Sequence, residues 1–383
     1  MHYICQHHVQ KYTFITMPPK DKKISVCLVA ISLGKGGSDR SCGLLSKMLT
    51  AQGYEVHLAV LNDRVEYPYE GQLLNLGEEK TSHDTFLKRF QRMGKLKKYL
   101  RKHQINFVID HRAKNSFFRE WGYKNYVYKG IKTIYVVHSY KMETYFGKTP
   151  HTFRKFYASN VANVAVSKGI KEAVERELHL SNFTTIYNAF DPDWIQKSTA
   201  EISIPKKKYV LSYGRIEDDI KDFSFLIQSF HLSQLWKENI SLVIMGEGRD
   251  VEKIQQLAKQ LEISDFVIFL PFMENPFPYI ANAHVVTLTS RWEGFPMVLL
   301  ESLALGTPVV SLDIQSGPSE IVEHGKNGLL IAKREVPLFS EALKEIFNNG
   351  LLYEECKANA KSSVSQFSIA QTAAQWSQIL TNE

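Results

Sequence analysis

Two glutamates flank an expected helix start in the segment 290–308, which reads SRWEGFPMVLLESLALGTP. Proline is favoured in the first turn of a helix and glycine at its C-cap, so Pro296 and Gly306 predict where this helix begins and ends. The free N–H groups and the dipole of a helix start bind anions such as phosphates. Glu293 lies just before the helix and Glu301 lies two turns inside it, roughly 12 Å further along the axis. Because this span matches that from a nucleotide ribose to its attached sugar, the segment predicts a nucleotide-sugar site whose carboxylates accept hydrogen bonds from hydroxyls.

A glycine-rich loop, SLGKGGSDR at 32–40, follows the first convincing strand and precedes a helical pattern. Gly36 and Gly37 would let backbone N–H groups approach a ligand oxygen at the start of that helix. Asp39 stands where the dinucleotide fingerprint requires glycine, so nicotinamide binding is disfavoured, and the Walker pattern is absent as well. Taken alone, the loop is equally compatible with a simple tight turn.

Two cations and one histidine complete the set of candidate residues. Arg215 comes at a strand end and Lys221 at the next helix start, a pairing that can clamp a diphosphate. The acids between them, at 217–219, also fit a solvated turn with compensating charges. His138 ends another expected strand, a position where a lone histidine is more often structural.

Short β-branched runs alternate with amphipathic helical patterns in both halves of the chain, which predicts parallel sheets built from βαβ units. A polar stretch at 188–208, with an Asp-Pro pair and a lysine run, marks the expected domain boundary. The predicted fold class is therefore α/β, with two doubly wound Rossmann-like domains facing each other across a cleft, where ligands bind beyond the carboxyl ends of the strands. The expected parts are a flexible extension (1–22), a first domain (23–195), a second domain (205–365) and a C-terminal helix crossing back to the first domain (366–383). The expected strands are 24–31, 56–61, 107–110, 133–137 and 161–167 in the first half, and 209–213, 240–245, 267–270, 285–288 and 308–312 in the second.

Composition excludes several classes of protein. The 383 residues suit two domains, and 44% hydrophobic with 23% charged residues is ordinary for a globular protein. No apolar run reaches the ~18–20 residues of a membrane-spanning helix, and the first residues lack the apolar core of a secretory signal. Four scattered cysteines without a C-x-x-C pair fit a reducing compartment and argue against a disulfide framework or a zinc site. These features predict a cytoplasmic protein.

Positive charge is concentrated in the first half of the chain. Residues 1–190 hold 30 Lys and Arg against 15 Asp and Glu, a net charge of +15, whereas residues 191–383 hold 17 against 25, a net charge of −8. A basic half of this kind meets anionic partners such as phosphates or a membrane surface.

The densest basic segment is Lys88–Lys102, within a stretch (85–109) that contains eight Lys or Arg and no acid. Phe86, Phe90, Met93 and Leu100 recur at helical spacing, so the segment predicts an amphipathic basic helix. We expect its apolar stripe to pack on the first sheet and its basic face to meet anionic headgroups, each charge contributing about 1 kcal/mol. Nucleic acid is not an expected partner, because no recognisable reader motif accompanies the charge.

Eight segments, from about Ile24 to the C-terminus, carry a family resemblance. They are GKGGSDR (34–40), VVHSY (136–140), AVSKGI (165–170), IYNAFD (186–191), YGRIEDDIKDF (213–223), MGEGRD (245–250), SRWEGFPMVLLE (290–301) and SGPSEIVEHGKNGLLI (316–331). In this order they resemble the motifs of the retaining glycosyltransferases of family 4, which have the two-domain GT-B fold. The resemblance points to the bacterial members that build surface polysaccharides or lipid-linked glycans.

The resemblance implies a role for each candidate residue. Glu301 would bind the ribose hydroxyls and Glu293 the hydroxyls of the donor sugar, while His138 would lie beside the donor sugar and the acceptor. The diphosphate would be held by the turn before the helix, by the two cations and by the glycine loop of the opposite domain. The implied catalytic residues are thus His138 and Glu293, and the implied donor-binding residues are Gly36, Gly37, Arg215, Lys221, Gly294, Phe295, Pro296 and Glu301.

The resemblance also implies a mechanism that needs no cofactor and no divalent metal, because fixed positive charge and a helix dipole stabilise the leaving nucleoside diphosphate. In the mechanism usually proposed for the family, the acceptor hydroxyl attacks on the face from which the leaving group departs. The leaving phosphate itself takes the acceptor proton.

Three positions depart from the family pattern. Asp39 replaces the glutamate that usually precedes the arginine of the first loop. The spacing from Arg215 to Lys221 is one residue longer than usual, which weakens the assignment of Lys221 to the diphosphate. The segment 270–272, Leu-Pro-Phe, replaces a glycine-containing turn near the nucleotide base, so the base preference cannot be read there.

We therefore expect a hexosyltransferase that moves a hexose or N-acetylhexosamine from a nucleotide sugar to a glycan or lipid-linked acceptor in cell-surface polysaccharide synthesis. The segment SGPSE (316–320) resembles galactose- or N-acetylhexosamine-transferring relatives, which favours a UDP-linked donor. A GDP-mannose-dependent mannosyltransferase is the alternative, followed by a GT-B sugar-nucleotide epimerase and by a non-catalytic basic binding protein. We expect the protein to work in the cytoplasm, peripherally on the inner face of the membrane.

Overall fold

The computed structural model describes residues 23–34, 36–80, 84–147, 149–191, 205 and 207–381. The predicted extension at 1–22 lies outside these residues, as does nearly all of the predicted boundary between 195 and 205. The described residues form two sheets, each made from one half of the chain.

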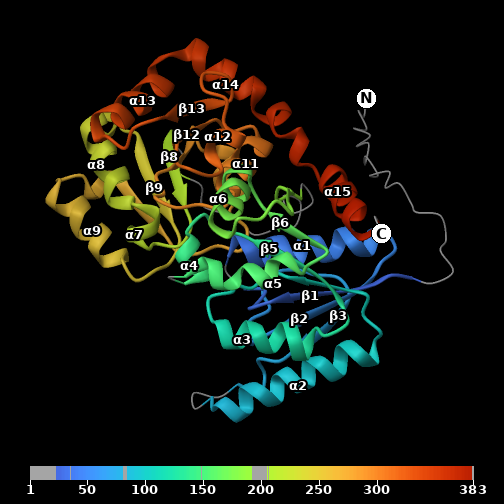
Figure 1. Ribbon diagram of the computed structural model, residues 1–383. Coiled ribbons are helices and arrows are strands. Elements are labelled where there is room, and N and C mark those ends of the chain that lie inside the picture. The colour runs from blue at the N-terminus through green and yellow to red at the C-terminus, as the bar shows by residue number, and fades with distance from the viewer. Residues whose placement is uncertain are drawn as a thin grey trace, which may run out of the picture.

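The first half forms a seven-stranded parallel sheet in the order β3-β2-β1-β4-β5-β6-β7. All residues of β1 and β4 are buried because helices cover both faces, with α1 on one side and α2 and α3 on the other (Figure 1). The strands are β1 (Ser25–Ala30), β2 (Glu55–Val60), β3 (Gln72–Asn75), β4 (Phe107–Asp110), β5 (Lys132–Val137), β6 (Ala162–Ala165) and β7 (Phe183–Thr185). The helices are α1 (Gly37–Ala51), α2 (Phe86–Lys102), α3 (Phe117–Gly122), α4 (Met142–Phe146), α5 (Arg154–Ala158) and α6 (Lys168–Leu178).

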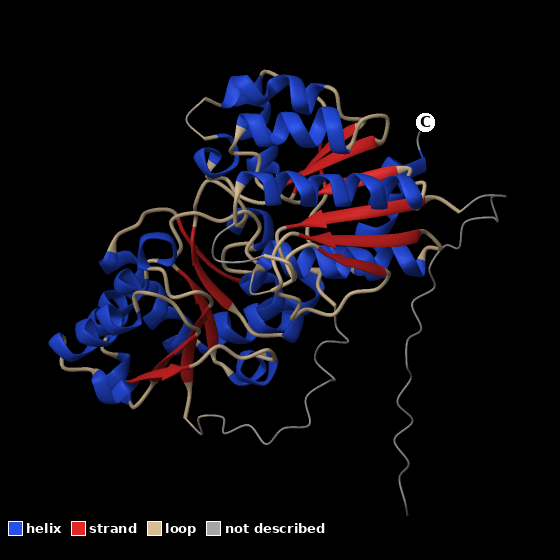
Figure 2. Cartoon of the chain, turned by 90° about the horizontal axis from the view of Figure 1, so that it is seen from below, coloured by secondary structure: helices blue, strands red, loops and turns tan. Residues whose placement is uncertain are grey.

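The second half forms a six-stranded parallel sheet in the order β10-β9-β8-β11-β12-β13, again between layers of helices (Figure 2). The strands are β8 (Tyr209–Tyr213), β9 (Ser241–Met245), β10 (Val267–Leu270), β11 (Val285–Leu288), β12 (Val309–Leu312) and β13 (Gly328–Ile331). The helices are α7 (Asp218–Lys221), α8 (Phe223–Ser233), α9 (Val251–Gln260), α10 (Phe277–Asn282), α11 (Met297–Leu305), α12 (Pro318–Ile321), α13 (Val336–Asn348), α14 (Gly350–Ser363) and α15 (Ile369–Thr381).

The prediction of two doubly wound parallel sheets is confirmed. The ten expected strands all form, each within two residues of its expected ends. The three strands that were not expected, β3, β7 and β13, are short and each lies at the edge of its sheet, where less burial leaves a weaker hydrophobic pattern.

The strand order of each sheet reverses once, between β1 and β4 in the first and between β8 and β11 in the second. Ligands of doubly wound sheets bind beyond the strand ends at this reversal. The loops after β1, β4, β8 and β11 are therefore the ones that the fold brings together at the cleft.

An aromatic cluster joins the two domains behind the cleft. Tyr187 on the connecting segment packs against Phe295 and Phe367, with ring centroids 5.1 Å apart in both cases, and Phe295 and Phe367 are 5.2 Å apart. Aromatic pairs at such distances bury a large apolar area. The cluster thus joins the turn at Phe295 to both segments that connect the domains.

Helix α15 returns from the second domain and packs on α1 of the first (Figure 1). Ala373 of α15 lies in one buried cluster with Leu44 and Met48 of α1. The hydroxyl of Ser377 donates a hydrogen bond of 2.7 Å to the side-chain oxygen of Gln52 at the end of α1. The first domain is therefore covered by a helix that follows the whole second domain in the sequence.

The basic helix forms as predicted, but its apolar stripe packs only in part. On α2, Leu96 and Leu100 are buried against the first sheet, whereas Phe86 and Phe90 are exposed. The first turns of the helix extend beyond the sheet that it covers, and there Phe90 stacks on Tyr126 instead, with ring centroids 5.4 Å apart. The expectation that the whole stripe packs on the sheet is wrong for these two residues.

None of the helices in the described part of the chain combines the length and the hydropathy that crossing a bilayer demands. Cys27, Cys42 and Cys356 are buried and carry free thiols. The remaining cysteine, Cys5, lies outside the described residues.

Candidate active site

A cleft of about 680 Å³ lies between the domains. It is lined by the loops after β1, β4, β5, β8 and β11, which the reversal of strand order brings to one place. All the candidate residues from the sequence lie along this cleft: His138, Gly36, Gly37, Arg215, Lys221, Glu293, Gly294, Phe295, Pro296 and Glu301.

Helix α11 begins at the cleft, one residue later than the sequence predicted. Pro296 has ψ of 96° and is the N-cap, so the first helical residue is Met297, while Gly306 ends the helix at φ of 89° as expected. Proline has no N–H, so the donors at this helix start come from Met297 and the residues after it. No side chain among the described residues caps this start, which leaves it able to bind an anion.

Gly294 lies in close contact with the opposite domain. A Cβ atom on Gly294 would lie 2.0 Å from the backbone oxygen of His138, a distance that no side chain could occupy. Beside it, the backbone N–H of Tyr140 donates a hydrogen bond of 3.3 Å to the carbonyl of Glu293. The loop after β5 therefore rests directly on the donor-side turn, and only glycine permits this approach.

Glu301 is buried and both of its carboxylate oxygens are engaged. Oε1 lies 2.5 Å from Nη1 of Arg40, which comes from α1 in the opposite domain. Oε2 accepts a hydrogen bond of 2.7 Å from the hydroxyl of Tyr213 at the end of β8. Burial and the nearby Glu301 carboxylate hold the pKa of Tyr213 well above its usual range, so the phenol stays a neutral donor. The predicted ribose-binding carboxylate is thus held in a fixed position by two partners.

Glu293 is paired with Lys221 rather than with solvent. The Nζ atom of Lys221 lies 2.7 Å from Oε1 of Glu293. The extra residue between Arg215 and Lys221 is accommodated by α7, which ends at Asp222 in the left-handed region with φ of 54°. The structure therefore brings Lys221 to the carboxylate expected at the donor sugar.

Arg215 is the more exposed of the two cations, with 64% of its side chain accessible at the cleft. Two of the acids that follow it are engaged elsewhere, because Asp218 accepts hydrogen bonds from Ser224 and pairs with Lys253, and Asp219 pairs with Arg249. Neither acid lines the cleft. These two acids are therefore directed away from the cleft, whereas the third, Glu217, pairs with Arg215 itself at 3.4 Å.

The glycine loop is shaped by Asp39. Its Oδ2 atom accepts hydrogen bonds from the Ser32 hydroxyl at 2.7 Å and from the Gly34 N–H at 3.0 Å, which closes the turn between β1 and α1. Burial raises the pKa of Asp39 above its ordinary value. A Cβ on Gly37 would lie 3.8 Å from the side chain of Met297, so the starts of α1 and α11 approach each other across the cleft. The starts of α1 and α11 therefore both face the cleft.

His138 forms a pair with a second histidine that the sequence did not single out. His111 follows β4 and His138 follows β5, and Nδ1 of His111 lies 2.9 Å from Nε2 of His138. Burial lowers the pKa of His111 to about 4, and burial, His111 and Lys114 hold the pKa of His138 well below its usual value. Two neutral rings in contact share one proton, so the tautomer of each ring fixes that of the other.

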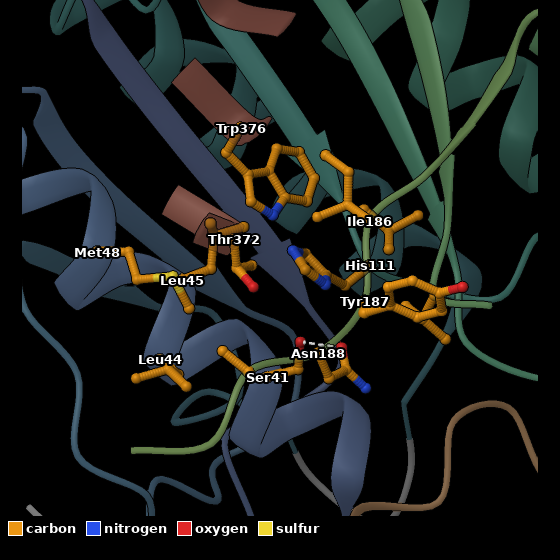
Figure 3. A pocket seen from close by; sticks show the side chains of 13 residues that line it. Ser41, Leu44, Leu45, Met48, His111, Ile186, Tyr187, Asn188, Thr372 and Trp376 are labelled. Atoms are coloured by element: carbon orange, nitrogen blue, oxygen red, sulfur yellow. Dashed lines mark hydrogen bonds between the residues drawn. The ribbon is translucent and has the colours of Figure 1, made fainter. Parts of the chain in front are cut away.

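A small cavity of about 10 Å³, the space that one water molecule needs, lies next to His111 (Figure 3). It is enclosed by α1, by the segment 186–189 and by α15. Within it the Ser41 hydroxyl donates a hydrogen bond of 2.7 Å to the Asn188 oxygen, and Trp376 lies on the opposite side of His111. Helix α15, which follows the second domain in the sequence, therefore packs beside the pair formed by His111 and His138.

Comparison with known proteins identifies the family to which this chain belongs. The chain matches the family model described as Glycosyltransferase Family 4 over residues 35–194 and the one described as Glycosyl transferases group 1 over residues 195–363. A Campylobacter jejuni protein named N-acetylgalactosamine-N,N'-diacetylbacillosaminyl-diphospho-undecaprenol 4-alpha-N-acetylgalactosaminyltransferase is 30% identical over 350 residues, covering 88% of this chain and 93% of that protein. The chain belongs to the family 4 glycosyltransferases.

Two further comparisons extend this finding. A second Campylobacter jejuni protein, named GalNAc-alpha-(1->4)-GalNAc-alpha-(1->3)-diNAcBac-PP-undecaprenol alpha-1,4-N-acetyl-D-galactosaminyltransferase, is 23% identical, covering 93% of this chain and 98% of that protein. The crystal structure of Anabaena HepE in complex with UDP and glucose superposes with a TM-score of 0.74 at 18% identity, covering 94% of this chain and all of that one. The fold of this family 4 glycosyltransferase is therefore GT-B, as the sequence predicted.

The segment SGPSE of this glycosyltransferase supports the site from outside the cleft. The Ser316 hydroxyl donates a hydrogen bond of 2.8 Å to the Gly294 carbonyl, and a Cβ on Gly317 would lie 2.4 Å from the ring of Pro296. Glu320 accepts hydrogen bonds from the N–H groups of Lys168 and Gly169 at the start of α6 in the first domain. These residues do not line the cleft, so the segment holds the donor-side turn and the domain contact in place.

Three residues of the glycosyltransferase site were missed by the sequence reading: Arg40, Tyr213 and His111. Arg40 and Tyr213 lie inside quoted motifs, but their partner Glu301 is far away in the sequence. His111 directly follows β4. Only the prediction that β4 and β5 are neighbouring strands could have paired it with His138. Among the described residues, no three His, Cys, Asp or Glu side chains gather as a metal site would require.

Proposed function

We propose that this glycosyltransferase moves an N-acetylhexosamine or hexose, with retention of configuration, from a UDP-linked donor to a lipid-linked glycan in bacterial surface polysaccharide synthesis. The observation that carries the proposal is the position of Glu293 and Glu301 on either side of the α11 start, inside a cleft lined by both domains. The two Campylobacter jejuni relatives are named for transfer of N-acetylgalactosamine to glycans on undecaprenol diphosphate, which supports both the donor sugar and the lipid-linked acceptor.

In the proposed complex the ribose hydroxyls bind Glu301 beside Tyr213. The diphosphate lies at the starts of α1 and α11, where two helix dipoles and Arg215 supply positive potential without a metal ion. The donor sugar lies between Glu293 and His138. Because Arg40 and Lys221 already occupy the two glutamates, the donor hydroxyls join or displace these cations when they bind.

Retention follows if the acceptor hydroxyl attacks the anomeric carbon on the face that the diphosphate leaves. The bond from the anomeric carbon to the phosphate oxygen breaks, the bond to the acceptor oxygen forms, and the acceptor proton passes to the leaving phosphate oxygen. The carboxylates among the described cleft residues are Asp39, Glu247, Glu293 and Glu301. The three that lie nearest the helix starts in the sequence, Asp39, Glu293 and Glu301, are held by neighbouring groups. This engagement supports a mechanism without a carboxylate nucleophile. Proton NMR of the first product formed from an α-linked donor tests it, because a β-linked product would contradict retention.

A UDP-linked donor is favoured by the complex of HepE with UDP and glucose. The GDP-mannose alternative remains testable at the same cleft, which Gly214, Met245 and Phe272 also line. A thermal-shift panel of UDP, GDP and ADP with their sugars discriminates among the bases. Stabilisation by GDP and GDP-mannose alone would replace this donor assignment.

Turnover assays distinguish transfer from the remaining alternatives. A transferase releases UDP from the donor faster when an undecaprenol-diphosphate-linked glycan is present, and it forms a longer glycan. An epimerase converts the donor sugar without any acceptor, and a binding protein does neither. Equal turnover with and without acceptor, with no extended product, would overturn the proposal.

With a lipid-linked acceptor and a soluble nucleotide-sugar donor, we infer that the enzyme works at the cytoplasmic face of a membrane, which it contacts peripherally. The net charge of +15 in residues 1–190 against −8 in residues 191–383 supports an orientation with the first domain toward anionic lipid. Vesicle sedimentation at increasing anionic lipid content measures this contact.

A further inference from the structure

Trp292 is a large aromatic side chain that is exposed inside the cleft. It is 37% exposed, lines the cleft and directly precedes Glu293. The other exposed large aromatic side chains of the described residues, such as Trp121, belong to α2 and α3, and none of them lines the cleft. Aromatic side chains that line a concave site are typical of ligand contacts. We therefore looked for the ligand that Trp292 could bind.

The loop that carries Trp292 is held on both sides of this residue. The N–H of Arg291 donates a hydrogen bond of 2.7 Å to the carbonyl of Ile220. On the other side, the carbonyl of Glu293 accepts a hydrogen bond of 3.3 Å from the N–H of Tyr140. The exposure of the indole is therefore not the result of a loose loop. A rigid aromatic ring on a fixed loop loses little conformational entropy when a ligand covers it.

Tyr140 extends this aromatic surface into the opposite domain. Its ring is nearly parallel to that of Trp292, with 17° between the ring planes and 6.4 Å between the centroids. Tyr140 follows His138 by two residues, and Trp292 precedes Glu293 by one. The aromatic pair is therefore next in sequence to both residues that are expected beside the donor sugar.

The chemistry of this surface suits the ring of a sugar. One face of a pyranose carries several C–H bonds, and the negative potential over an aromatic ring attracts such polarised C–H bonds. The nucleotide base is a less suitable occupant, because Glu301, the proposed ribose ligand, lies further along α11, on the side of Glu293 away from Trp292. The donor sugar itself is proposed to lie between Glu293 and His138. The ring that remains for Trp292 is that of the acceptor.

We propose that Trp292, extended by Tyr140, binds the terminal sugar ring of the acceptor glycan by stacking. The ligand is a neutral hexose or N-acetylhexosamine in glycosidic linkage. The inference rests on the proposed function, because it assigns the acceptor side of the same cleft. A ring stacked on Trp292 presents its hydroxyls toward the neighbouring donor sugar, at the residue that follows Trp292 in the loop.

Initial rates test this assignment with soluble acceptors, namely the methyl α-glycosides of N-acetylgalactosamine, N-acetylglucosamine, galactose and glucose. The donor is the nucleotide sugar that stabilises the protein most in the thermal-shift panel. Trp292→Ala should raise KM for the acceptor about tenfold, while KM for the donor stays within about twofold of wild type. Trp292→Phe keeps an aromatic face and should recover most of the affinity. The matched control is Trp121→Ala, which removes a tryptophan 55% exposed outside the cleft and should behave like wild type.

Trp292 also reports binding directly. Titration of the UDP-saturated protein with the same glycosides should change the tryptophan fluorescence. Trp292→Phe should remove this change, whereas Trp121→Phe should keep it. A protein that responds to none of the four glycosides, or a response that Trp292→Phe leaves unchanged, would overturn the assignment. A rise in KM for the donor rather than for the acceptor in Trp292→Ala would also overturn it and place the indole beside the donor sugar.

Further measurements separate this test from folding and from the proposed function. Trp292→Ala should be stabilised by UDP as much as wild type, which excludes a displaced loop, and Trp292→Phe carries the comparison if it is not. If wild type transfers sugar and Trp292→Ala leaves KM for the acceptor unchanged, the stacking site fails and the proposed function stands. If the glycosides change the fluorescence through Trp292 but no sugar is transferred, the stacking site stands and the proposed function fails.

Discussion

Arg40 and Glu301 join the two domains inside the cleft, with Nη1 of Arg40 on α1 lying 2.5 Å from Oε1 of Glu301 on α11. Both side chains are largely buried, so removal of one partner leaves an uncompensated charge in the other. The pair therefore links the carboxylate expected to bind ribose to the position of the opposite domain.

The first prediction concerns nucleotide affinity. Glu301→Ala should weaken UDP binding by about 1.5–3 kcal/mol, roughly 10- to 150-fold, because a charged hydrogen-bond partner is lost. Isothermal titration calorimetry measures the change. Glu323→Ala, which removes an exposed carboxylate paired only with Lys326, serves as the control and should bind UDP like wild type. Unchanged affinity in Glu301→Ala would remove Glu301 from the nucleotide site.

The second prediction concerns the contact between the domains. A double-mutant cycle of Arg40→Met and Glu301→Gln, measured by urea unfolding, should give a coupling free energy of about 1–3 kcal/mol because the pair is desolvated. The exposed pair of Arg249 and Asp219 is the matched control and should show no measurable coupling. Equal coupling in the two cycles would mean that the buried pair does not hold the domains together.

The third prediction separates chemistry from binding. Glu293→Gln should lower kcat more than it weakens UDP binding, because Glu293 lies at the expected sugar end of the site, whereas Glu301 is the carboxylate proposed to bind the nucleotide. Lys221→Met should have an effect of the same kind, since Lys221 and Glu293 form one ion pair. Single-turnover rates and UDP titrations, run on both variants, measure the two effects. A loss of UDP affinity as large as the loss of rate would contradict the separation.

The fourth prediction concerns metal ions. Transfer should persist in excess chelator, because in the proposed complex Arg215 and the starts of α1 and α11 supply the positive potential that the leaving diphosphate needs. The assay compares initial rates with and without EDTA, then with added magnesium or manganese. Complete loss in EDTA, restored by either ion, would show that the diphosphate is held by a metal.

The fifth prediction concerns acid stability. The pKa of His111 is about 4 in the folded protein against 6.5 for a free histidine, so below pH 6.5 the unfolded chain binds more protons than the folded one. The free energy of unfolding should therefore fall as pH drops from 6.5 to 4, by on the order of 3 kcal/mol for this residue. Asp110 raises and Lys114 lowers the pKa of His111, and both stay charged over this range.

Urea unfolding at several pH values tests this dependence. His111→Asn should make the slope between pH 6.5 and 4 shallower by about one proton. His179→Asn, at an exposed helix C-cap in the left-handed region, is the control and should keep the slope of wild type. An unchanged slope in His111→Asn would show that His111 is protonated in the folded state.

The sequence predicted the positions of the candidate residues better than their partners. Gly36, Arg215 and Glu293 each follow a strand, and parallel strands deliver their ends to one edge, so local pattern was enough to bring them to the cleft. The side-chain partners of the candidate residues depend on which distant segments the fold brings together, and no local sequence pattern encodes this. Within the second domain, the ion pair of Lys221 with Glu293 likewise joins two loops that lie far apart in the sequence.

Helical spacing likewise predicted helix α2, but it did not predict how much of the apolar stripe of α2 would pack on the first sheet. Periodicity identifies which side chains share a face, and Phe86 and Phe90 do share one with Leu100. It cannot say how far the neighbouring sheet extends along the helix. The exposed aromatic residues follow from that mismatch in length, which only the structure shows.

The return of α15 to α1 has a consequence for how the protein is made. A ribosome releases residues 23–191 long before it releases α15, so α1 emerges with its apolar residues Leu44 and Met48 still uncovered. The first domain therefore reaches its final packing only after the second has been synthesised. Nascent chains stalled before Ile369 should therefore be more sensitive to proteases around α1 than completed chains.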